Sequence, residues 1–353
     1  MRSAVKLAGI LALLGSVASA GDLVAQGTAP NTPAVTVGGV VYAQYLYQLK
    51  DTANHINNFD ITRSYINVIG KFPSGLLGRV TADIYRNADN SLAYRLKYAY
   101  AAFTPENSPL TFKFGEIHTP LLDWEEALWD YRMQGQMAME RGGYVSSSDF
   151  GFGVDGNWKK DLVNMQVGIY NGENYNRGVG DQRKDAMGRV SVRVKETDDG
   201  SRVGGLRVTG YGQVGKPTGG GLRDRWLGMV SYKSKMLTLA GEYARTEDRQ
   251  DAPPAPATPQ LVNIDGEIWS FFGVLHIPGS RAAIIGRVDL TDPNRDGDNN
   301  KQTRFIGGVS YQLTPALRLL ADIDNVGFEG DAPVAPAVYA TKTQGLFQAQ
   351  YAF

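Results

Sequence analysis

Gln344-Gly345-Leu346-Phe347-Gln348-Ala349-Gln350-Tyr351-Ala352-Phe353 is the last stretch of the chain. Successive side chains of an extended strand point to opposite faces. One face would hold Phe347, Ala349, Tyr351 and Phe353, and the other Gln348 and Gln350. The stretch predicts a strand with an apolar medium on one side and a polar medium on the other. An ordinary sheet strand that happens to come last would show the same alternation, so the rest of the chain must decide.

The N-terminus has the pattern of an export signal. Arg2 and Lys6 precede the apolar run 7–17, and Ala18-Ser19-Ala20 supplies the small residues of a cleavage site. The run is shorter than the roughly 20 apolar residues that a transmembrane helix needs, and no long apolar run follows it. We expect a cleaved signal peptide at 1–20, a short lead-in at 21–33 and one folded domain at 34–353.

Composition excludes several classes of function. The 353 residues contain no cysteine, which removes thiol catalysis and thiolate metal sites. Lysine and arginine total 36, as do aspartate and glutamate, so no net field favours nucleic acid as a partner. With 42 glycines and 18 tyrosines the chain suits strands and tight turns.

Apolar and polar residues alternate along most of the chain, which indicates strands with one apolar face. The cleanest example is 189–195, where Val190, Val192 and Val194 oppose charged and polar residues. In 92–98 the pattern places Tyr98 on the apolar face with Leu96. Sixteen strands are predicted, at 35–50, 59–72, 76–86, 92–104, 109–118, 147–159, 161–172, 184–195, 206–216, 223–234, 236–247, 262–277, 281–291, 302–313, 315–326 and 342–353.

The predicted connections sort by parity. Those that follow odd-numbered strands tend to be long, at 51–58, 119–146, 173–183, 248–261, 292–301 and 327–341. Those that follow even-numbered strands tend to be short, at 73–75, 160–161, 278–280 and 314–315, with exceptions near 87–91 and 196–205. Short turns on one rim and long loops on the other are typical of outer-membrane barrels. The predicted fold is therefore all-β, a 16-stranded antiparallel transmembrane barrel with short periplasmic turns and long external loops.

Charge assigns the two faces of the strands. A lysine or arginine that points into lipid near the bilayer centre costs roughly 2–4 kcal/mol, so the strand cations should face the inside of the barrel. A soluble sandwich with these charges on its outer face would show the same alternation, but it has no reason to sort its loops. A barrel of sixteen strands is too wide to be filled by side chains and leaves an aqueous channel.

The longest irregular stretch, 119–146, is the third long loop. It contains Trp124 and Trp129 together with several Leu and Met residues, which is more apolar than a solvated loop should be. We expect this loop to fold into the barrel, pack on its wall and narrow the channel, with its charges facing Lys113, Arg95 and Lys97. A cap over the rim or a contact with a neighbouring subunit is the alternative.

Three stretches of the chain follow one another in a recognisable order. They are Phe59-Asp60-Ile61-Thr62-Arg63-Ser64-Tyr65 with Gly70-Lys71-Phe72, Leu110-Thr111-Phe112-Lys113-Phe114-Gly115-Glu116 with Thr119-Pro120 and Glu125, and Met139-Glu140-Arg141 with Ser148-Asp149-Phe150-Gly151. Together they resemble the phosphate-selective (O/P-type) outer-membrane porins. The resemblance covers about 59–157 and implies a sixteen-stranded, usually trimeric channel with anion preference from basic residues at its constriction. The third loop departs from that pattern, because its acidic residues outnumber Arg132 and Arg141.

The candidate site is the set of charged residues expected to line the channel and its constriction. These are Arg79, Arg95, Lys97, Lys113, Arg132, Arg141, Glu125, Glu126, Asp130, Arg189 and Arg193. Later strands supply more carboxylates, so a transverse field across the lumen is expected.

Other chemistry finds little support. The histidines at 55, 118 and 276 lie far apart in the chain and match no metal-ligand or catalytic spacing. The segment 292–298 resembles the start of a calcium loop, but Thr303 stands where the bidentate glutamate belongs, and an ordinary Asp/Asn/Gly turn explains it as well. No cofactor or metal is predicted.

The sequence therefore predicts an outer-membrane porin of a Gram-negative-type bacterium and not an enzyme. It would form a water-filled channel for passive diffusion of small hydrophilic or anionic solutes, with membrane lipid around it and a homotrimer as its assembly. A barrel with a structural or adhesive role through its surface loops is the alternative, and a barrel-embedded enzyme is a third.

Overall fold

The computed structural model describes residues 33–50, 55–175, 182–217, 221–250, 263–329 and 342–353. The predicted signal peptide, the lead-in as far as residue 32 and most of the predicted loops 248–261 and 327–341 lie outside them. In the described part of the chain no helix is long and apolar enough to cross a membrane.

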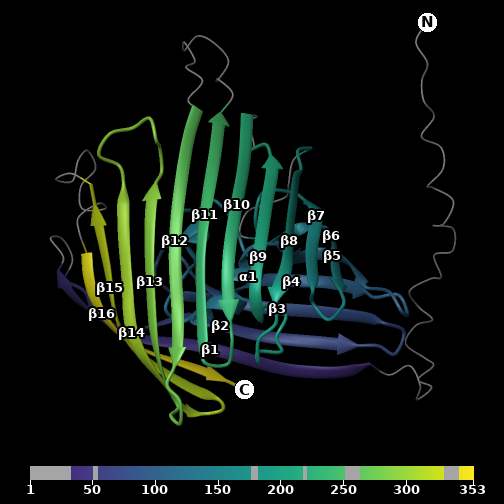
Figure 1. The fold of residues 1–353 in the computed structure, drawn as a ribbon, viewed down its shortest axis with the longest axis horizontal. Coiled ribbons are helices and arrows are strands. Elements are labelled where there is room, and N and C mark those ends of the chain that lie inside the picture. The colour runs from purple at the N-terminus through teal and green to yellow at the C-terminus, as the bar shows by residue number, and fades with distance from the viewer. Residues whose placement is uncertain (1–32, 51–54, 176–181, 218–220, 251–262, 330–341) are drawn as a thin grey trace, which may run out of the picture.

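The described residues form sixteen strands, close to the predicted ranges. They are β1 (Ala34–Lys50), β2 (Asn57–Lys71), β3 (Leu76–Arg86), β4 (Leu92–Phe103), β5 (Leu110–His118), β6 (Ser148–Trp158), β7 (Val163–Tyr170), β8 (Asp185–Lys195), β9 (Gly205–Gly215), β10 (Gly221–Lys233), β11 (Leu237–Gln250), β12 (Asn263–His276), β13 (Ala282–Asp292), β14 (Gln302–Thr314), β15 (Leu317–Phe328) and β16 (Lys342–Ala352). Each strand pairs antiparallel with its neighbours in chain order, and β1 pairs with β16 to close the sheet into a barrel (Figure 1). The predicted sixteen-stranded antiparallel barrel is confirmed.

The first and last strands pair along the whole seam apart from one irregularity between Gln48 and Lys50. Val40 lies opposite Ala352, and the pairing runs through ten positions to Lys50 opposite Thr343. The terminal residue extends it, because Phe353 N donates to Gly39 O (3.0 Å) and Gly39 N donates to Phe353 O (2.9 Å). The apolar, aromatic tail that predicted a last strand is the strand that closes the barrel.

The two rims differ as predicted. Connections after even-numbered strands have at most nine residues, the longest being 196–204. The 119–147 and 171–184 connections, which follow odd-numbered strands, are longer, although 87–91 and 216–220 are short. We call the two ends the short-turn rim and the long-loop rim.

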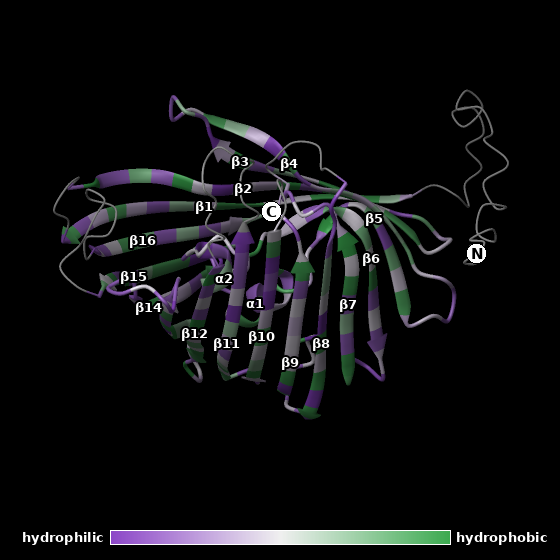
Figure 2. Cartoon of the chain, turned by 90° about the horizontal axis from the view of Figure 1, so that it is seen from above, coloured by the Kyte–Doolittle hydropathy of each residue, from purple (hydrophilic) through white to green (hydrophobic). Residues whose placement is uncertain are grey.

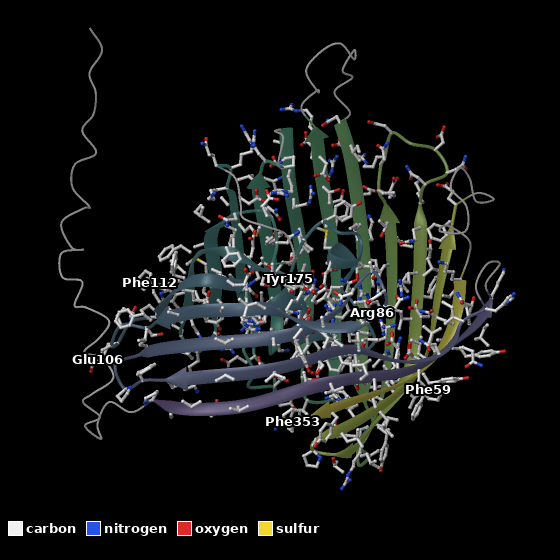
Figure 3. The ribbon with its side chains drawn as sticks, turned by 180° about the vertical axis from the view of Figure 1, so that it is seen from behind. Phe59, Arg86, Glu106, Phe112, Tyr175 and Phe353 are labelled. Atoms are coloured by element: carbon white, nitrogen blue, oxygen red, sulfur yellow. The ribbon has the colours of Figure 1, made fainter. Side chains whose placement is uncertain are left out.

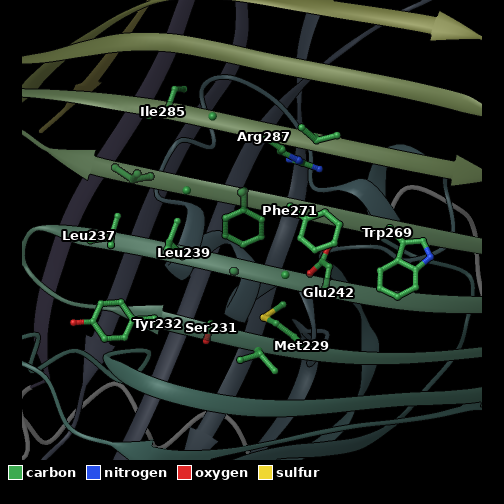
Figure 4. Close-up of a pocket in the computed structure, with 18 of the residues that line it drawn as sticks. Met229, Ser231, Tyr232, Leu237, Leu239, Glu242, Trp269, Phe271, Ile285 and Arg287 are labelled. Atoms are coloured by element: carbon green, nitrogen blue, oxygen red, sulfur yellow. The ribbon is translucent and has the colours of Figure 1, made fainter.

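Side-chain exposure separates the two faces of the barrel wall. Val190, Val192 and Val194 are 43%, 41% and 63% exposed, whereas Arg189 and Ser191 are buried inside. The same holds in β11–β13, where Leu239, Trp269 and Phe271 lie on the outer face and Glu242 and Arg287 are buried (Figure 4). Bands of alternating hydropathy run along the strands in Figure 2. The barrel thus has an apolar outside and a largely polar inside.

The alternation is broken in β4, and the prediction for Tyr98 is wrong. The register of the β3–β4 pairing shifts by one residue, because Thr81 lies opposite Tyr98 while Ala82 lies opposite Leu96. Lys97 is therefore the extra residue of a β-bulge. Lys97 and Tyr98 are 3% and 8% exposed, and both are buried. The bulge brings an aromatic ring and a cation to the inside together.

Candidate functional site

The connection 119–147, here called loop L3, folds into the barrel. It contains α1 (Leu122–Trp129) and α2 (Ala138–Arg141), and Thr119 N donates to Ser147 O at its base (3.2 Å). Leu121, Leu122 and Leu128 are completely buried, as are the two tryptophans of α1. Such a loop is stable only where its apolar side chains are covered. The predicted inward-folded third loop is confirmed.

Aromatic contacts place α1 on the wall opposite β1–β4. The Trp129 ring lies 5.6 Å from the Phe272 ring of β12 in an edge-to-face arrangement. The Arg189 guanidinium of β8 lies 4.0 Å from the centre of the Trp124 ring. An edge-to-face aromatic pair adds about 0.5–1.5 kcal/mol beyond area burial, so the two indoles are the principal anchors of L3.

Wall side chains also hold the backbone of L3. The donors reach backbone carbonyl oxygens along the whole loop: Arg189 to Pro120 (3.0 Å), Lys233 to Ala127 (2.8 Å), Arg318 to Asp130 (2.7 Å), Gln348 to Met133 (2.8 Å), Arg287 to Gln136 (3.0 Å) and Arg225 to Tyr144 (3.3 Å). Buried carbonyl groups need such partners. Several lumen-facing cations therefore fix the loop.

A cavity of about 740 Å³ remains between L3 and the strands on its open side. We call it the lumen cavity. Six arginines line it, namely Arg63, Arg86, Arg95, Arg132, Arg141 and Arg304, with the carboxylates Asp60 and Asp324. Apolar side chains contribute as well: Leu46, Ile61, Ile84, Leu92, Met133 and Leu346. Arg86, at the end of β3, is labelled in Figure 3.

Most of the cavity arginines are matched by carboxylates. Arg63 pairs with Asp83 (3.4 Å), Arg141 with Asp289 (3.2 Å), Arg86 with Asp60 and Arg304 with Asp324. Arg132 lies between two carboxylates of L3, Glu126 (2.8 Å) and Glu140 (2.9 Å). Burial lowers the pKa of Arg132, but the two carboxylates together raise it by more than burial lowers it. The pKa of Arg132 is therefore above its ordinary value. Arg132 carries its charge at any physiological pH.

Arg95 differs from the other five. Its Nη2 donates to the Tyr175 hydroxyl (2.9 Å), and its guanidinium lies 4.5 Å from the Tyr175 ring centre and 5.4 Å from that of Tyr85. In the described residues no carboxylate oxygen lies within ion-pair distance of it. Lys97, the bulge residue, donates to the Tyr65 hydroxyl (3.1 Å) and likewise has no carboxylate that close in the described chain.

Two buried carboxyl groups meet between α1 and the wall. Glu125 of α1 is completely buried next to Glu242 of β11, and none of the four carboxyl oxygens has a hydrogen-bond partner in the described part of the chain. Two carboxylates buried so close together repel each other, which favours the protonated form of one of them. Burial first, and then Glu242, hold the pKa of Glu125 well above its ordinary value, against the opposing influence of Arg287. Asp289 on β13 also faces Glu242.

The structure places three of the predicted site residues, Arg95, Arg132 and Arg141, on the lumen cavity. Burial and the nearby Arg304 and Arg287 lower the pKa of Arg141 to about 9. The charge pattern of single strands did not single out Arg63, Arg86 or Arg304. Their inward positions follow from strand parity, but their convergence depends on the barrel's closure.

The remaining predicted residues lie elsewhere inside the barrel. Arg79 donates to Asn67 (2.8 Å) and contacts His118, and Arg193 pairs with Glu196 (2.9 Å). Asp130 pairs with Arg318 (3.1 Å). Lys113 pairs with Asp155, not with a loop carboxylate as expected. The reason is local, because Lys113 lies opposite Gly153 on β6 and Asp155 is its diagonal neighbour.

The calcium-like segment forms ordinary turns. Asn294 N donates to Asp292 Oδ1 (3.2 Å), and Asp296 N donates to Asn294 Oδ1 (3.3 Å). Among the described residues no group of three or more histidine or acidic side chains converges as metal ligands would.

Solved structures with the same fold are porins and outer-membrane channels. The anion-selective porin from Comamonas acidovorans superposes with a TM-score of 0.67 at 13% identity, covering 91% of this chain and 100% of that one. The Salmonella typhi OmpF complex with daunomycin gives 0.66 at 12% identity, with 90% and 97% covered. The outer membrane channel DcaP of Acinetobacter baumannii gives 0.61 at 12% identity, with 91% and 98% covered. No family model and no curated protein sequence matches the chain. At these identities the likeness establishes the sixteen-stranded porin fold.

Proposed function

We propose that this chain is an outer-membrane porin, a water-filled channel through which small hydrophilic or anionic solutes diffuse passively. The observation that carries the proposal is the barrel's construction. Its outside is apolar, its inside is charged, and L3 leaves a cavity of about 740 Å³ lined by six arginines. A sixteen-stranded barrel leaves room for an aqueous path, and nothing in passive diffusion requires catalysis or a cofactor.

The outer face fits a lipid environment. Large apolar side chains such as Val80, Phe114 and Phe305 are more than half exposed on it. Exposed apolar area on this scale marks a surface that meets lipid or another protein. We propose the outer membrane of a Gram-negative-type bacterium, reached through the predicted signal peptide, with the short-turn rim in the periplasm and the long-loop rim outside.

Assembly as a homotrimer is part of the proposal. One neighbour, the OmpT outer membrane protein of Vibrio cholerae, was solved in a trimer form and shares the fold at a TM-score of 0.61. The relation to the phosphate-selective (O/P-type) porins is also a proposal, supported by the stretches around Asp60, Lys113 and Glu140.

A weak anion preference follows from the charges. Five of the six cavity arginines have carboxylate partners, and Arg95 has none among the described residues. One uncompensated cation, supported by Lys97 behind it, produces a modest positive potential, not a strong phosphate filter. The residues predicted to line the channel, from Arg79 to Arg193, keep that role as part of this proposal.

Planar-bilayer recording of the purified protein tests the proposal. We expect single-channel steps that grow with KCl concentration and, in a KCl gradient, a reversal potential displaced slightly toward that of chloride. Barrels that insert but do not conduct would contradict it and favour the adhesive alternative. A strongly cation-selective current would contradict the assigned charge balance.

A further inference from the structure

The lumen cavity combines two features that a filter for inorganic anions does not need. One is Arg95, the one cavity arginine that has no carboxylate partner in the part of the chain that the structure describes. The other is a partly apolar lining, which includes Ile84 of β3, Leu92 of β4 and Met133 of L3. A site for a small, strongly hydrated anion would be expected to be polar throughout, because apolar groups offer no replacement for water.

We propose that the lumen cavity holds a binding subsite for organic monocarboxylates with an apolar or aromatic body, in which Arg95 receives the carboxylate. The proposal deepens the channel function above and rests on it. Arginine presents a planar fork that matches a carboxylate, and such charge-assisted bonds are the stronger ones.

Two tyrosines hold the Arg95 side chain in position and leave its charge without a carboxylate partner among the described residues. Tyr175 accepts a hydrogen bond from Nη2 and, with Tyr85, gives the guanidinium two ring contacts. Cation–π contacts of this kind contribute about 0.5–2 kcal/mol and restrict the side chain without neutralising it. Tyr85 itself lines the cavity, so its ring is available to a flat apolar ligand.

Charge balance selects a monoanion. The other five arginines face six carboxylates, those of Asp83, Asp60, Asp289, Asp324, Glu126 and Glu140, and the sixth is balanced because Asp289 also pairs with the buried Arg287. A dianion such as hydrogen phosphate would have to displace one of these carboxylates or remain half-compensated in a confined space. A monocarboxylate needs only Arg95, and its body gains about 25 cal/mol for each Å² of apolar area that it buries.

The test measures current through single channels in KCl while benzoate, acetate or inorganic phosphate is added. Benzoate should reduce the current or raise its noise in a saturable manner, at concentrations at least tenfold below those at which acetate or phosphate does so. Equal potency of phosphate and benzoate would overturn the proposal, and so would block that never saturates.

Variants locate the site. Arg95→Gln should raise the apparent dissociation constant of benzoate at least tenfold while the channel still conducts KCl. Arg95→Lys keeps the charge but loses the fork, so it should keep the wild-type reversal potential and still bind benzoate weakly. The matched control is the double variant Arg245→Gln, Asp265→Asn, which removes an arginine–carboxylate pair away from the lumen cavity with no change of net charge and should leave the benzoate constant within twofold.

The two proposals fail differently. A protein that forms no channel in KCl fails the porin function itself. A protein that conducts KCl but shows no saturable benzoate effect, or whose effect survives Arg95→Gln, is a porin without this subsite.

Discussion

At the scale of single residues, inward-facing arginine serves two different purposes. Arg189 and Arg287 are buried and donate to carbonyl oxygens of L3, so removing either would leave a buried acceptor without its partner. Arg95 contacts two tyrosines and no carboxylate in the described chain, so its charge acts on the lumen. The number of cations inside a porin-like barrel is therefore a poor guide to its selectivity, and their pairing is a better one.

Arg95→Glu should move the reversal potential toward that of the cation. Two unit charges 4 Å apart interact with about 1 kcal/mol in water, which corresponds to roughly a fivefold change in a local concentration ratio. The permeability ratio of chloride to potassium should fall by about that factor, measured as zero-current potential in a KCl gradient. Lys113→Glu is the comparison, because Lys113 already pairs with Asp155 and is not among the residues that line the lumen cavity. An equal or larger shift from Lys113→Glu would contradict this assignment of the charges.

Glu125→Gln should make the barrel more stable at high pH. The pKa of Glu125 is raised in the folded protein by burial and by Glu242, so the folded state holds a proton that the unfolded state releases. Stability is then greatest below the unfolded pKa near 4.3. It falls as pH rises toward the folded pKa, by about 1.4 kcal/mol for each pH unit that separates the two pKa values. An amide at this position has no proton to lose.

The measurement is the urea midpoint of unfolding in detergent at pH 5 and at pH 9. The native protein should lose stability between the two, and Glu125→Gln should lose clearly less. Glu106→Gln, in the β4–β5 connection on the short-turn rim, is the control and should follow the native protein. Identical pH dependence for all three proteins would count against a raised pKa at Glu125.

At the scale of elements, the sequence shows the strands well and their irregularities poorly. Period-two alternation is a direct result of one apolar and one polar face, so sixteen strands could be located from residue type alone. The bulge at Lys97 could not, because it depends on the register between β3 and β4. Nor could the partner of Lys113, which was assigned to the loop although its own neighbouring strand supplies Asp155.

The third loop was predictable for a physical reason. Two tryptophans in an irregular stretch must be covered, and the barrel's interior is the nearest place that covers them. Its acidic residues were less informative. They depart from the basic constriction that the resemblance implies, but Asp123 pairs with Arg202 (2.8 Å), Asp130 with Arg318 (3.1 Å), and Glu126 and Glu140 share Arg132. A count of charges along one segment says nothing about partners that lie on distant strands.

Trp129→Ala should loosen L3 without unfolding the barrel. The ring is completely buried against Phe272, and truncation of a buried tryptophan typically costs about 3–5 kcal/mol. Because the β-ladder does not depend on this contact, the loss should appear as a changed mean conductance and as increased current noise. Trp226→Ala is the matched control, since Trp226 lies on the outer face and is 57% exposed. Unchanged conductance in Trp129→Ala would mean that L3 does not limit the current.

At the scale of the whole molecule, the pairing of the first and last strands closes a series of β-hairpins into a barrel. Each strand from β2 to β15 pairs with its neighbours in sequence, and only the β1–β16 pairing joins segments about three hundred residues apart. That single pairing removes both free sheet edges, which would otherwise invite association with other chains. It also brings Gln44 of β1 to Gln348 of β16, whose amide donates to Met133 of L3, so closure and the seating of the loop are linked.

A cross-link across the seam tests closure directly. Ala43 and Ala349 lie opposite each other on β1 and β16, and the chain has no native cysteine to compete. Directly opposed positions bring Cβ atoms to about 4.5–5.5 Å, close to what a disulfide requires. The double variant Ala43→Cys, Ala349→Cys should therefore form an intramolecular disulfide on mild oxidation, seen as a faster-migrating, reductant-sensitive band after denaturation. Ala43→Cys, Ala321→Cys is the control, because Ala321 lies one strand further away on β15, opposite Phe347, and should stay unlinked. Equal linkage in both variants, or in neither, would contradict the register at which β16 meets β1 and with it the closed barrel on which the channel depends.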